Sequence, residues 1–222
     1  MTPTAARICR LGEHLLLVEL GTTVDEEVNR RVLALAAWVR LQHWPGVLDV
    51  VPAFTSLGLH LRPTADDRAI EDRLRERLDG ARAAADDEPG KLVDIPVRYG
   101  GESGPDLDEV AALSGLPRAE VVERHAARTY RVFMLGFLPG FAYLGTLDPA
   151  IQVPRRTTPR SAVASGSVGL AGAQTGVYPR VSPGGWQIIG RTDVRLFDPG
   201  LDPPSRLAPG DRVRFVPVEI AS

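Results

Sequence analysis

Apolar residues follow two different periods in the first ninety residues of the chain. His14–Leu20 is a mostly apolar run of strand length, and VLDVV at 47–51 indicates a second strand. Between these runs, apolar residues recur at intervals of three and four, as on one face of a helix: Val24, Val28, Val32, Leu35 and Val39. Thr23 and Glu26 have the spacing of a capping box, so we expect this helix to begin there.

A further strand and a second helix follow in the same half. Alternate residues of segment 55–61 are apolar or β-branched, which is typical of a half-buried strand. Pro63-Thr64 then predicts a helix start, with Ile70, Leu74 and Leu78 four residues apart. The order βαββαβ predicts a small α+β domain, ferredoxin-like in order, at residues 1–90. Its last ten residues, ARAAADDEPG at 81–90, are polar and small, and we expect them to form a linker.

The second half has another pattern, with short apolar runs separated by glycine and proline. Two short helices are predicted at 107–115 and 117–128, followed by a strand at 129–135. From there to the end, runs such as SVGLAG, WQIIG and VRFVP alternate with turn residues. Many short strands with regular turns are typical of a barrel or sandwich. Residues 91–222 are therefore predicted to form a second, β-rich domain.

The composition of the chain argues against several classes of function. The formal net charge is −2, so no overall field favours nucleic acid or an anionic membrane. The first residues lack the features of a signal peptide, and we expect a cytoplasmic protein. Lys91 is the single lysine, which excludes a Walker A phosphate loop and makes a Schiff base or a carrier lysine for biotin improbable. The histidines have no metal-like spacing, so no metal site is predicted.

The stretch GFLPGFAYLG at 136–145 combines aromatic side chains with turn-forming residues. In one interpretation, its rings close the end of a barrel and its glycines meet tight backbone requirements. In the other, the stretch is the rim of a pocket or a partner surface, where aromatic rings supply large contact areas. The residues assigned to this rim are Phe137, Pro139, Phe141 and Tyr143.

PRRTTPR at 154–160 places Arg155, Arg156 and Arg160 in one short segment between prolines. It is either a solvated loop or a clamp for a carboxylate or phosphate, because guanidinium offers planar bidentate donors. Arg160 is the best placed of the three for such a clamp. The glycines of GSVGLAGAQTG (166–176) favour strand corners over a phosphate cradle, since no helix pattern follows them.

Four further side chains are candidates for chemistry. Gln174 and Tyr178 are uncharged polar residues that could line a pocket beside a strand. His125 lies on a predicted helix and is either a structural residue or a base for proton transfer. Arg191 could reach an acidic ligand. Trp186, in SPGGWQIIGRT (182–192), is assigned to the core or to an interface.

These motifs, with YGG and GPDL (99–107), ERHAARTY (123–130), LFDP (196–199) and LAPGDRVRFVP (207–217), resemble one family in the same order. It is the family of the B subunit of 5-oxoprolinase, also called allophanate hydrolase subunit 1. The family is similar to a histidine-kinase inhibitor of spore formers and to part of the carboxyltransferase region of urea carboxylases. The resemblance implies an N-terminal α+β domain, a cyclophilin-like β-barrel, and a complex with a companion C subunit. A third subunit joins for ATP-dependent opening of 5-oxoproline to glutamate, with ATP as co-substrate.

Under this interpretation, His125, Arg160, Gln174, Tyr178 and Arg191 are the predicted catalytic residues. Arg155, Arg156 and Trp186 join the aromatic rim of the substrate or partner site. Two other functions stay open: a regulatory protein that binds a histidine kinase, and a carboxyltransferase that uses a separate biotin carrier. Proline isomerisation by the barrel is a fourth. The chain lacks a Gly-x-Ser-x-Gly elbow, and its one lysine gives no amidase arrangement, so it is a poor hydrolase alone.

Overall fold

The computed structural model describes residues 6–80 and 90–221. The chain divides into two compact units, Met1–Pro89 and Gly90–Ser222. Each unit has its own hydrophobic core. The predicted linker at 81–90 lies outside the described residues, except for Gly90. No helix of the described residues combines the length and apolar character needed to cross a membrane.

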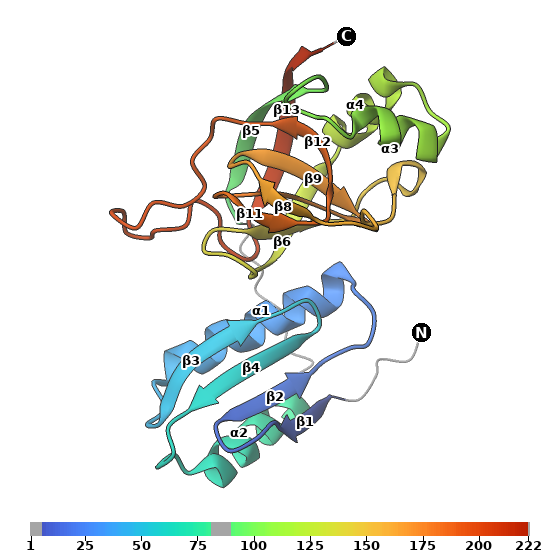
Figure 1. Cartoon of the computed structure of the whole chain (residues 1–222). Coiled ribbons are helices and arrows are strands. Elements are labelled where there is room, and N and C mark those ends of the chain that lie inside the picture. Colours follow the sequence, from blue (N-terminus) through green and yellow to red (C-terminus); the bar gives the residue numbers. More distant parts are fainter. Residues whose placement is uncertain (1–5, 81–89, 222) are drawn as a thin grey trace. The chain divides into compact units, whose positions relative to one another are not determined.

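The first unit is a four-stranded antiparallel sheet in the order β1-β2-β4-β3. Its strands are β1 (Arg7–Arg10), β2 (Leu15–Glu19), β3 (Val47–Pro52) and β4 (Ser56–Leu61). Helices α1 (Glu26–Gln42) and α2 (Asp67–Gly80) lie on the same side of the sheet (Figure 1). They cover the face formed by alternate strand residues, which are buried: Leu16, Val18, Leu57, Leu59 and Leu61.

Three details of this unit refine the sequence prediction. The strand that follows α2 does not return to this sheet, and the edge beside β2 is occupied by β1 from the N-terminal side. The predicted capping box at Thr23 is wrong, because Asp25 is the N-cap of α1 and its carboxylate accepts from the N–H groups of Glu27 and Val28 at 2.8 and 3.2 Å. The second helix also begins later than predicted, after Asp66, whose carboxylate accepts from the N–H of Ala69.

The second unit is a closed barrel in the order β10-β7-β6-β13-β5-β12-β9. All neighbouring pairs are antiparallel except β13 with β5, which is parallel. The barrel strands are β5 (Leu92–Tyr99), β6 (Thr129–Leu135), β7 (Ala142–Gly145), β9 (Ser167–Ala171), β10 (Gln174–Val177), β12 (Gln187–Arg191) and β13 (Arg212–Ile220). The predicted fold class, an α+β unit followed by a β-barrel, is confirmed.

Several shorter helices and strands lie outside the barrel order. Helices α3 (Leu107–Ser114) and α4 (Arg118–Ala126) lie next to each other outside the barrel wall (Figure 1). The 3-10 helix η1 (Pro149–Ile151) follows β7. Strands β8 (Arg160–Val163) and β11 (Ser182–Gly184) pair with each other in a separate two-stranded sheet. This small sheet carries the end of the arginine-rich segment, and it therefore positions the candidate site.

Candidate functional site

The first six residues of the stretch GFLPGFAYLG, 136–141, connect β6 to β7, and its last four residues are β7 itself. Its first part closes a tight turn, in which the N–H of Gly136 donates to the carbonyl of Phe141 at 3.1 Å. Gly140 has a φ of +81°, and a Cβ there would lie 2.6 Å from the Cβ of Phe197, so only glycine fits. Phe137 has a φ of +67°, which is uncommon for a bulky residue. The turn thus imposes an unusual backbone on an aromatic residue at its tip.

Five rings gather beside this turn, and we call them the aromatic cluster: Phe137, Phe141, Tyr143, Tyr178 and Trp186. The ring of Phe141 is central, with its centroid 5.0 to 5.4 Å from those of the other four. The contacts are edge-to-face, the geometry that the aromatic quadrupole favours. Phe141, Tyr178 and Trp186 are buried, whereas Phe137 is 58% exposed and Pro139 is exposed as well. The cluster therefore has a packed base and an exposed edge, so each interpretation of the stretch describes part of it.

The arginines of PRRTTPR meet a buried carboxylate. Arg160 donates to Asp106 with both terminal nitrogens, at 2.8 Å to Oδ2 and 2.6 Å to Oδ1. Arg156 Nη1 donates to the same Oδ1 at 2.9 Å, and the backbone N–H of Ile188 donates to Oδ2 at 2.6 Å. Asp106 is only 2% exposed. Its carboxylate therefore joins three segments: the arginine loop, β12, and the start of α3.

This junction changes the interpretation of Arg160. The hydrogen bond to Asp106 raises the pKa of Arg160, and it occupies the planar fork that would otherwise receive an anion. The predicted clamp role of Arg160 is therefore not supported by its position. Removing one partner of a buried ion pair typically costs about 3–5 kcal/mol, so we assign Arg156 and Arg160 to holding the loop in place.

Sequence reasoning missed Asp106. The residue lies in GPDL, one of the segments that carry the family resemblance, so the motif itself was the available signal. Its partners follow 50 and 54 residues later in the chain. Nothing in local periodicity links positions so far apart, and only the closure of the barrel brings them together.

The remaining polar candidates are more dispersed. Gln174 is half-buried at the start of β10, where it pairs with Gly145 of β7. Arg191 is exposed at the end of β12, and its Nε donates to the carbonyl of Ser165 at 3.1 Å. Gln174 and Arg191 thus lie at the ends of two different strands, β10 and β12, whereas Arg160 is held by Asp106.

His125 lies inside the barrel unit and is fully buried. Its Nδ1 is 2.8 Å from the hydroxyl of Tyr99, its Nε2 is 2.9 Å from the hydroxyl of Thr175, and its ring stacks on Phe215 at 4.5 Å. Burial lowers the pKa of His125 to about 3, so the imidazole is neutral at neutral pH. A general base must reach its substrate, whereas both of these nitrogens are engaged inside the core. The position of His125 supports the structural interpretation.

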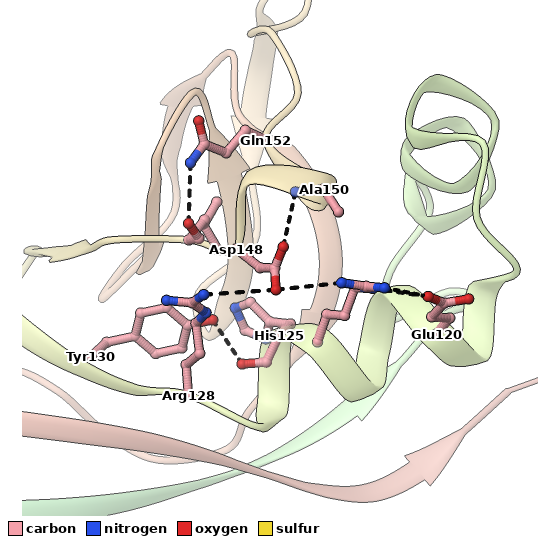
Figure 2. Close-up of polar contacts among 9 residues, drawn as sticks. Glu120, His125, Arg128, Tyr130, Asp148, Ala150 and Gln152 are labelled. Atoms are coloured by element: carbon pink, nitrogen blue, oxygen red, sulfur yellow. Dashed lines mark hydrogen bonds and ion pairs between the residues drawn. The ribbon is translucent and has the colours of Figure 1, made fainter.

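A groove of about 480 Å³ is lined by residues of the α4 segment and by Asp148. Asp148 lines this groove and pairs with Arg124 and Arg128 at carboxylate–guanidinium distances of 3.5 and 3.7 Å. Figure 2 shows Asp148 beside Arg128. The N–H of Ala150 donates to Asp148 at 2.9 Å, and this bond contributes most to lowering the pKa of Asp148. Arg124 also pairs with Glu120 at 2.6 Å. The charged groups at this groove are paired with one another. The arginine loop and the aromatic cluster therefore form a stronger candidate site than the groove.

Residues 6–207 match the family model of the carboxyltransferase domain, subdomain C and D. The chain belongs to this family. It is 43% identical to the B subunit of 5-oxoprolinase from Bacillus subtilis, over 95% of this chain and 92% of the relative. It is also 43% identical to the B subunit of 5-oxoprolinase from Escherichia coli, over 96% of each chain. The structure of TTHA0988 is 42% identical with a TM-score of 0.82, and the match covers 92% of this chain but 40% of that one. The resemblance to the B subunit of 5-oxoprolinase is confirmed.

Proposed function

We propose that this protein is the B subunit of an ATP-dependent 5-oxoprolinase, which opens 5-oxoproline to L-glutamate in the cytoplasm. The observation that carries the proposal is the 43% identity to two relatives of that name, over at least 92% of each relative. The likeness therefore extends across the relatives and is not confined to a shared module.

The proposal includes a companion C subunit and a third subunit that depends on ATP. The letter B in the names of the relatives supports a multi-subunit assembly. TTHA0988 adds support of another kind, because 60% of that chain lies beyond the match and can hold further domains in the same polypeptide. We place ATP binding mainly outside this chain.

The chemistry of the reaction suggests what this protein contributes. A lactam is a stable amide, and opening it requires activation of its oxygen or of the attacking water. Such a site needs fixed donors for negative charge and a surface that excludes water. We propose that the arginine loop and the exposed edge of the aromatic cluster form one wall of a cleft that the companion C subunit completes. Phe137 and Pro139 provide apolar surface for that contact.

The test is 5-oxoproline-dependent ATP hydrolysis by this protein together with its companion and third subunits, with each one omitted in turn. We expect turnover only when all three are present. Turnover that continues without this protein would refute the proposal. Should a stable complex form with the companion and show no turnover, a carboxyltransferase or regulatory role would replace it.

The exposed edge of the cluster has its own test. Phe137→Ala should weaken turnover or assembly while leaving the melting temperature unchanged, because this ring is 58% exposed. Val181→Ala is the matched control, since Val181 is a similarly exposed apolar residue, at 64%, in the same unit. Equal effects of the two substitutions would contradict a specific role for the aromatic ring.

A further inference from the structure

The three arginines of the loop at 154–160 have different surroundings. Asp106 holds Arg160 and Arg156, and Arg156 also donates to Glu109 Oε2 at 3.1 Å. Arg155 is exposed, and its side chain makes no hydrogen bond or ion pair with a described residue of its own unit. Of the three guanidinium groups, that of Arg155 therefore has N–H donors that can bind an anion.

The loop that carries Arg155 is fixed on both sides. The N–H of the next residue, Arg156, donates to the carbonyl of Gly185 at 2.8 Å. Arg160 pairs with Gly184 across the two-stranded sheet. A Cβ at Gly184 would collide with the hydroxyl of Tyr178, so the loop rests directly on a segment that packs against this tyrosine. Arg155 is therefore presented from a rigid support beside Tyr178.

The causes of the pKa shift of Tyr178 agree with this placement. Burial raises the pKa of Tyr178, and the N–H of Trp186 and the positive charge of Arg155 partly oppose that rise. The exposed ring of Phe137 meets the same tyrosine edge-on, with centroids 6.4 Å apart. The support of the loop that carries Arg155 and the exposed ring of Phe137 therefore both lie beside Tyr178.

We propose that Arg155 binds the carboxylate of 5-oxoproline and that the exposed ring of Phe137 contacts the five-membered ring of the same molecule. The inference rests on the proposed function. Guanidinium binds carboxylate in a bidentate geometry, and an apolar face beside it suits the methylene groups of a small ring. Arg156 and Arg160 are positioning residues in this arrangement, because their ion pairs with Asp106 fix the loop.

The experiment compares two lactams in the reconstituted complex: 5-oxoproline, and 2-pyrrolidinone, which has the same ring without the carboxylate. With Arg155→Gln, we expect the KM for 5-oxoproline to rise about tenfold or more, the range for loss of a charged hydrogen bond, with kcat nearly unchanged. The ratio of kcat/KM for 5-oxoproline to that for 2-pyrrolidinone should fall by the same factor. Arg212→Gln, at an exposed arginine of β13, is the matched control and should leave both values unchanged.

Two results with the active complex would overturn the inference. Equal loss of activity toward both lactams would show that Arg155 does not bind the carboxylate. Loss of co-purification with the companion would show that its anion is a carboxylate of that partner. If the wild-type complex has no oxoprolinase activity, the proposed function fails separately. Calorimetric titration of this protein with 5-oxoproline then decides: binding that Arg155→Gln weakens supports the inference, and absence of binding to the wild type overturns it.

Discussion

Lowering the pH from 7 to 5 should destabilise the barrel through His125. The pKa of this residue is about 3 in the folded protein, because the imidazole is buried, and about 6.5 in an unfolded chain. The unfolded state therefore binds the proton more readily, and stability is lost as the pH falls from about 6.5 toward 3. At pH 5 the solution is about 1.5 pH units below the pKa of the unfolded histidine. At ~1.4 kcal/mol per unit, the free energy of unfolding falls by about 2 kcal/mol.

Urea unfolding at pH 7, 6 and 5 measures this loss. Trp186 fluorescence reports on the barrel in a Trp38→Phe/Trp44→Phe background, because those two tryptophans belong to the first unit. His125→Gln removes the titrating group, so its stability should change by about 2 kcal/mol less between pH 7 and 5. Asp148, whose pKa is lowered, titrates below this window. Equal pH dependence in the wild type and in His125→Gln would refute the reasoning.

Four further substitutions test the contacts within each unit. Asp106→Ala should lower the unfolding free energy of the barrel by about 3–5 kcal/mol in urea titrations, because two arginines lose a buried partner. Asp193→Ala removes an exposed bidentate pair and should be nearly neutral, and equal losses would contradict the buried junction. Thr175→Val should cost about 1–3 kcal/mol, because it leaves His125 Nε2 without a partner, and a thermal melt checks this. Asp25→Ala should cost about 1 kcal/mol in the first unit alone, reported by Trp38 fluorescence.

Much of the fold could be predicted because its signals are local. The strand expected at 129–135 has those bounds in the structure, and the helices expected at 107–115 and 117–128 correspond to α3 and α4. Each of these elements shows its period within a dozen residues. The edge strand β1 was missed, since Arg7–Arg10 is short and has no apolar alternation of its own. It is a strand only because it pairs with β2.

The candidate site was less predictable than the fold. Local sequence specified the residue types available, above all the arginines of PRRTTPR and the rings of GFLPGFAYLG. It could not show that Arg156 and Arg160 are held by Asp106 while Arg155 is left exposed. Burial and ion pairing are properties of segments brought together across the chain. Which arginine is free to bind an anion, and the place of His125 in the core, therefore follow from the folded barrel and from no shorter stretch of it.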